Sequence, residues 1–151
     1  MIIVKVDDSF TSQVDSASLQ LAAQATLEYQ EKFAEADLSI VITDNSQIQA
    51  MNLQFRGIDS PTDVLSFPAD FLDPDTGQTY LGDVIISYPK CYAQAQSADH
   101  SVDQELTLLV IHGVLHLIGY DHNHIEGKKR MWSVQTDILK QLGYNGIRLA
   151  D

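Results

Sequence analysis

The sequence TLLVIHGVLHLIGYDH, residues 107–122, joins a long apolar run to three histidines. Ser101 and Gln104 precede it with the spacing of a capping box, which predicts a helix that begins there and continues through the apolar run. Gly119 is a typical residue for the position just after a helix C-terminus. We therefore expect the helix to end at this glycine and the chain to turn back.

The three histidines of this stretch have the spacing of a metal site. Side chains four residues apart lie on one face of a helix, with Cβ atoms about 5–6 Å apart, so His112 and His116 can reach one ion. The turn at Gly119 can return His122 to the same point. Three imidazoles with an open position are typical of a catalytic Zn²⁺ site, although imidazole also suits Ni²⁺, so nickel or another divalent ion stays open.

The alternative for any single histidine on an apolar helix is a hydrogen-bonded core or boundary residue. The three histidines together, with a glycine at the predicted helix end, favour metal ligands instead. We expect His100, which lies beside a helix cap, to be solvated. We expect His124 to be a loop residue at the start of the next helix or an adventitious ligand.

A zinc protease motif matches this stretch in part. The histidines and Gly119 are in register with the metzincin pattern H-E-x-x-H-x-x-G-x-x-H. Gly113, however, stands where the protease has the Glu that acts as general base. The residues needed for peptide hydrolysis are therefore incomplete, and the sequence predicts a metal hydrolase of another kind.

Positive charge is scarce in this chain. It has 9 Lys and Arg against 21 Asp and Glu, for a net charge of −12, which taken alone argues against a nucleic-acid partner. A phosphodiester substrate needs local positive charge, and Arg56, with its planar fork of donors, is the candidate for that role. The alternative for Arg56 is a contact with the dipole at a helix end. The basic run at 128–130 is read as a solvated helix face, with a phosphate contact close to the metal as its alternative.

The rest of the chain predicts a single α+β domain over residues 1–151. Apolar runs predict strands at 2–6, 38–43, 63–67 and 82–87, the last two as a hairpin around a turn at 73–77. Helices are expected at about 16–33, between Asp44 and Gly57, from Pro89 to about Ala98, through 107–118, and from a capping box of Asn123 and Glu126 to Gly143. This order indicates a small mixed β-sheet of about four strands covered by about five helices.

The cysteine count and the N-terminal sequence indicate a cytoplasmic protein. Cys91 is the only cysteine, so no internal disulfide can form and a reducing compartment fits. The apolar run from Ile2 to Val6 is too short for a signal peptide or a membrane span. We therefore expect no association with a membrane.

Three separated motifs together resemble the YbeY family of bacterial endoribonucleases: PTDVLSFP (61–68), LGDVIIS (81–87) and HGVLHLIGYDH (112–122). The segment MWSVQTDIL (131–139) is similar to the C-terminal part of the family, with Trp132 where the family more often has Phe. The resemblance covers about residues 36 to 143.

The resemblance implies a metal-dependent single-strand endoribonuclease with zinc on His112, His116 and His122 and with a functionally important Arg56. It also implies a role in 16S rRNA 3′-end maturation and ribosome quality control. The expected partners are ribosomal RNA and the small ribosomal subunit, with a ribosomal protein or an assembly GTPase left open as a recruiting factor. Two alternatives stay open: a zinc-containing ribosome-assembly factor without intrinsic cleavage, and a metzincin-like metallopeptidase.

Two aspartates near these motifs have roles that the sequence leaves open. Asp121, beside the third histidine, either orients a histidine or accepts a proton, or is a turn residue bonded to local backbone. We favour the turn. Asp63 either caps local backbone or pairs with Arg56.

Overall fold

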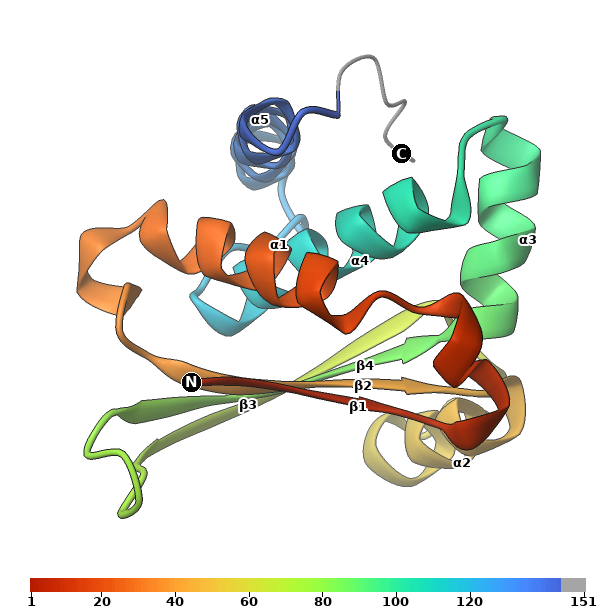
Figure 1. Cartoon of the computed structure of the whole chain (residues 1–151), viewed down its shortest axis with the longest axis horizontal. Coiled ribbons are helices and arrows are strands. Elements are labelled where there is room, and N and C mark those ends of the chain that lie inside the picture. Colours follow the sequence, from red (N-terminus) through yellow and green to blue (C-terminus); the bar gives the residue numbers. More distant parts are fainter. Residues whose placement is uncertain (145–151) are drawn as a thin grey trace.

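The four predicted strands form one mixed sheet in the order β1-β2-β4-β3 (Figure 1). The computed structural model describes residues 1–144. The sheet runs parallel from β1 to β2 and from β2 to β4, whereas β3 is antiparallel to β4. The strands are β1 (Ile2–Val6), β2 (Asp37–Thr43), β3 (Val64–Leu72) and β4 (Thr79–Ser87).

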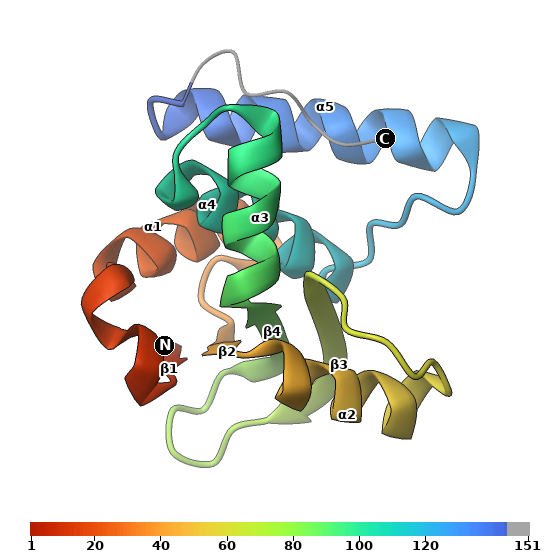
Figure 2. The same cartoon turned by 90° about the vertical axis from the view of Figure 1, so that its right-hand side faces the viewer.

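Helices lie on both faces of this sheet. Within residues 1–144, two 3₁₀ turns, at Asp8–Gln13 and Glu31–Phe33, accompany five α-helices. In Figures 1 and 2, α1 and α4 cover one face, α5 lies beyond α4, and α2 lies on the opposite face. The predicted α+β fold is therefore confirmed. The helices are α1 (Ser16–Glu28), α2 (Asn45–Arg56), α3 (Tyr88–Ala98), α4 (Val102–Leu117) and α5 (Ile125–Gln141).

The alternation of side chains along β4 divides the core in two. Successive residues of a strand point to opposite faces. Val84 and Ile86 therefore join the main core beneath α1 and α4, whereas Ile85 packs with Leu65 and Ile48 under α2. The small second core fixes α2 against the sheet, and the C-terminal end of α2 carries Arg56.

Helix α4 is buried along most of its length, as expected for a helix that is apolar almost all round. Its predicted capping box forms, with the Ser101 and Gln104 side chains each accepting the other residue's backbone N–H at 3.1 Å. Its C-terminus is a Schellman motif, in which Gly119 has φ +103° and the Tyr120 N–H donates to the Leu115 carbonyl at 3.0 Å. This turn directs the following residues back along the helix.

Two predicted helix boundaries were wrong, and in both places a hydrogen bond outside the predicted helix accompanies the difference. The first helix ends at Glu28 rather than near residue 33, because Gln30 is extended and its side chain donates to the Tyr120 hydroxyl at 3.0 Å. The last helix does not begin with a capping box at Asn123. The Asn123 N–H instead donates to Asp121 at 3.2 Å, and His124 is the N-cap without a side-chain hydrogen bond.

The hairpin of β3 and β4 is longer than predicted, because backbone pairing continues to the turn. The Asp73 N–H donates to the Gln78 carbonyl at 2.8 Å, which closes the strands around the predicted turn residues. Within residues 1–144, none of the helices combines the length and apolar character needed to cross a membrane.

Candidate metal centre

The structure brings the three predicted histidines together. His112 and His116 lie one turn apart on α4, and His122 returns on the loop between α4 and α5. One ring nitrogen from each lies within 4.8 Å of the others. The ring centroids are 4.7 to 5.4 Å apart. Such a set of imidazoles can surround one ion and leave a coordination position open.

His112 is oriented by a buried glutamine on α5. Its Nδ1 lies 2.7 Å from Oε1 of Gln135, whose side chain is almost completely buried. An amide oxygen only accepts, so Nδ1 of His112 carries the proton and Nε2 presents its lone pair to the site. Nε2 of His116 lies 3.1 Å from this atom. A hydrogen bond such as the one from Nδ1 of His112 to Gln135 fixes the tautomer of a metal-binding histidine.

Burial and neighbouring rings keep the helical histidines neutral. Burial lowers the pKa of His112 below its ordinary value. Burial and the adjacent His112 and His122 lower the pKa of His116 to about 4. Both imidazoles are therefore unprotonated at neutral pH, the form that a metal ion requires.

Gln135 was not predicted as a functional residue, although the sequence carries a signal for it. Gln135 lies on the buried face of α5 in register with Met131, Val134 and Ile138. A polar residue on the buried face of an amphipathic helix needs a hydrogen-bond partner. The motif alone could not identify that partner, because it lies on a different helix.

Replacing Gln135 by leucine is expected to weaken zinc binding about 10- to 100-fold, because His112 loses the acceptor that holds its ring. Zinc affinity measured with a competing chelator tests this. The same substitution at Gln141, which is exposed on the same helix, is the control and should leave the affinity unchanged. Equal affinities for the two variants would show that Gln135 does not orient the ligand.

Gly113 is a glycine because α4 crosses the sheet at this point. A Cβ at Gly113 would lie 2.5 Å from Cγ1 of Val84, and the Ser66 hydroxyl donates to the Gly113 carbonyl at 2.9 Å. The position that carries the general base in a metzincin is thus closed here by β3 and β4. A larger side chain at Gly113 would require Val84 to move, and the general base of the metallopeptidase alternative is absent from this position.

Gly113→Ala is expected to lower the free energy of unfolding by about 1–3 kcal/mol through overpacking. Chemical denaturation of the metal-free protein measures this cost. Val84→Ala removes Cγ1, the atom that the new Cβ would contact. The double variant should therefore lose less unfolding free energy than the sum of the losses in the two single variants. Additive losses would mean that this contact does not limit the position.

Arg56 shares a groove with the histidines. Together with the segment 62–66, Arg56 and the three histidines line a cavity of about 470 Å³. Arg56 is exposed at the end of α2, and Gly57 with φ +72° ends the helix as predicted. Among residues 1–144 it forms no ion pair. Arg56 is therefore an exposed cation in the lining of the groove that contains the histidines.

The two aspartates whose roles the sequence left open, Asp63 and Asp121, have structural roles. Asp63 accepts from the Val64 N–H at 2.8 Å and from the Gln94 amide at 3.2 Å, so it caps backbone and does not pair with Arg56. Asp121 accepts from the Asn123 N–H, the turn contact favoured above.

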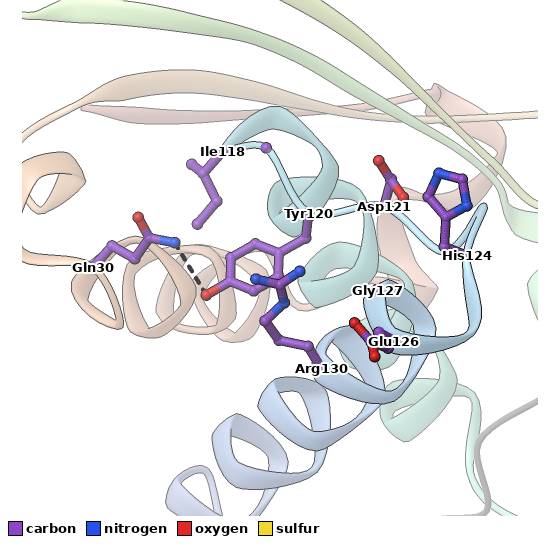
Figure 3. Close-up of a pocket in the computed structure, with 9 residues that line it drawn as sticks. Gln30, Ile118, Tyr120, Asp121, His124, Glu126, Gly127 and Arg130 are labelled. Carbon is purple, nitrogen blue, oxygen red and sulfur yellow. Dashed lines mark hydrogen bonds between the residues drawn. The ribbon is translucent and has the colours of Figure 1, made fainter.

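The loop between α4 and α5, which carries His122, is also held by a contact near the end of α1. In Figure 3 the Tyr120 hydroxyl accepts a hydrogen bond from Gln30. These two residues line a cavity of about 420 Å³, which we call the rear cavity. Arg130 and His124 border this rear cavity, whereas Lys128 borders a different cavity beside the histidines. The basic run at 128–130 is therefore divided between two sides of the loop.

His100 is not solvated, so that prediction was wrong. Its Nε2 lies 2.6 Å from Oε1 of Glu105, and the two side chains are only 9% and 8% exposed. The sequence could not reveal this pair, because it depends on the turn between α3 and α4 folding over the first turn of α4.

Comparisons with known proteins agree with the motifs. The family model described as Endoribonuclease YbeY matches residues 5–143. The chain is 39% identical to an Endoribonuclease YbeY of Roseiflexus sp. (strain RS-1), covering 93% of this chain and 91% of that protein. It is 42% identical to one of Dehalococcoides mccartyi (strain CBDB1), with the same two coverages.

The fold also resembles a solved structure. The solution structure of TM1509 from Thermotoga maritima matches with a TM-score of 0.62 at 24% identity, covering 100% of this chain and 97% of that one. At this level of identity the likeness concerns the fold alone.

Proposed function

We propose, from the premise that this chain belongs to the YbeY family of endoribonucleases, that it cleaves single-stranded RNA at the three-histidine centre with zinc as cofactor. The observation that carries the proposal is the groove in which Arg56 and three converging imidazoles lie together. This groove combines a set of metal ligands with a phosphate-binding cation, which is what hydrolysis of a phosphodiester requires.

The donor set suits zinc. Three imidazoles, two of them kept neutral by burial, form the nitrogen-rich set that Zn²⁺ prefers, and Ni²⁺ would accept the same ligands. His112, His116 and His122 would hold the ion, with Gln135 fixing the first of them. When bound, zinc supplies Lewis-acid chemistry by making water more acidic and polarising a phosphoryl oxygen.

Arg56 supplies the positive charge for the substrate. A guanidinium binds two phosphate oxygens at once through its planar fork. Because Arg56 borders the groove from the opposite element, α2, it can hold the phosphodiester across from the histidines. Its positive charge then stabilises the negative charge that develops on the phosphate oxygens as the bond breaks.

We place this activity in the cytoplasm, at the 3′ end of the 16S rRNA precursor on the small ribosomal subunit, and in ribosome quality control. Support comes from the family membership and the three motifs. The net charge of −12 restricts RNA contact to local sites such as this groove. An acidic body also suits a recruiting ribosomal protein or assembly GTPase.

Cleavage of a 16S 3′-end precursor RNA by the zinc-loaded protein tests the proposal. We expect a cut in the single-stranded 3′ extension and none when a complementary strand covers it. If the RNA stays intact while the protein still binds the small subunit, the assembly-factor alternative replaces the nuclease. The peptidase alternative is weakened because Gly113 stands where a metzincin has its general base and packs closely against Val84.

A further inference from the structure

A second cavity adjoins the metal groove between α4 and α5. Its volume is about 290 Å³. It shares Asp63, His112 and His122 with the groove that contains Arg56. The two spaces are therefore lined in part by the same residues of the metal centre, which places the cavity next to a substrate held in the groove.

The lining of the cavity includes one aromatic side chain beside the histidines and two aliphatic ones. Trp132 of α5 lies with its ring centroid 5.9 Å from that of His112 and 5.7 Å from that of His122. Leu108 and Leu109 of α4 line the same space. Aromatic and aliphatic side chains of this kind provide the stacking and apolar contacts by which proteins bind unpaired nucleobases.

A buried carboxylate lines the cavity. It belongs to Glu105, and its Oε1 lies 2.6 Å from Nε2 of the partly buried His100. A buried carboxylate is costly unless it is paired and hydrogen-bonded. Glu105 is outside the cluster of potential metal ligands found among residues 1–144. Its place in the cavity wall presents an acceptor group to whatever occupies that space.

We propose that this cavity binds the nucleobase next to the scissile phosphate and selects bases that bear an amino group. The inference rests on the proposed RNA cleavage. A carboxylate only accepts hydrogen bonds, so it favours guanine, which offers two adjacent donors on its Watson–Crick edge. Cytosine and adenine each offer an amino group. Uracil offers one donor between two acceptors and fits worst.

The single tryptophan makes this testable without catalysis, because Trp132 is the only one in the chain. The full-length protein, kept free of metal with a chelator, is titrated with uridine heptamers that carry one G, C, A or abasic site. We expect the G-containing heptamer to change the Trp132 fluorescence most and to bind about tenfold more tightly than all-U or abasic RNA. Equal affinity for all five would overturn the subsite.

Variants distinguish the contribution of the Trp132 ring from that of the Glu105 carboxylate, with affinity measured by the anisotropy of labelled RNA. Glu105→Gln should bind the G and all-U heptamers with nearly equal affinity. Trp132→Ala should bind the G heptamer about tenfold more weakly. Trp132→Phe should keep the ranking, as should Arg130→Ala at the rear cavity. Thermal unfolding checks each fold, and if Glu105→Gln is unfolded, the Trp132 pair decides. An unchanged affinity in Trp132→Ala overturns the proposal.

Adding zinc back distinguishes failure of the proposed base-binding cavity from failure of the proposed nuclease activity. Base-selective fluorescence without cleavage after zinc is restored would support the subsite and overturn the nuclease. Cleavage beside every base with equal affinity and rate would support the nuclease and overturn the subsite.

Discussion

His116→Ala should lose zinc and RNA cleavage together. The site then keeps two imidazoles, one of them on an exposed loop residue. The loss of zinc affinity should exceed the roughly 10- to 100-fold loss that follows from removing a residue that hydrogen-bonds to a metal ligand. Metal analysis after dialysis against a weak chelator, and cleavage of a single-stranded RNA, measure the two effects on the same sample.

His124→Ala is the matched control for this experiment. His124 is exposed, is absent from the ligand cluster and makes no side-chain capping hydrogen bond as N-cap of α5. Its variant should keep one zinc per chain and full cleavage. If His116→Ala retained zinc and activity at the level of His124→Ala, the three-histidine centre would not be the active site.

Arg56→Ala should cleave about 10²- to 10³-fold more slowly while it binds zinc as the wild type does. The expected loss reflects one cation removed from a site where negative charge develops. Arg56→Lys should recover only part of the rate, because an ammonium lacks the bidentate fork. Single-turnover kinetics with zinc content measured in parallel test this.

The structural alternative for Arg56 predicts a different outcome. An exposed arginine at the end of α2 interacts with the helix dipole, which contributes about 0.3–1 kcal/mol to stability. If Arg56→Ala lowered stability by that amount and left the cleavage rate unchanged, its role would be that of a helix-terminal residue only.

Much of the site follows from local sequence geometry. The spacing of His112 and His116 places them on one helix face, and Gly119 ends the helix where His122 can return, so local rules suffice to bring the rings together. The strands and most helix ends likewise follow from periodicity and capping residues.

The missed features depend on contacts between distant segments. Gln135 acquires its role only when α5 packs on α4, and His100 is buried only when the chain folds it against Glu105. At Asn123 a capping box was expected from sequence, but Asp121 takes the backbone N–H first. Local rules fail where a neighbouring turn or another helix offers a better partner.

The most direct test of the account is a zinc titration of the metal-free protein with cleavage of single-stranded RNA as the readout. If the three-histidine centre is the active site, activity should rise in proportion to bound zinc and stop rising at one zinc per chain. His116→Ala should show no rise. Cleavage by the metal-free protein at the full rate, or the same activity in His116→Ala, would contradict the account.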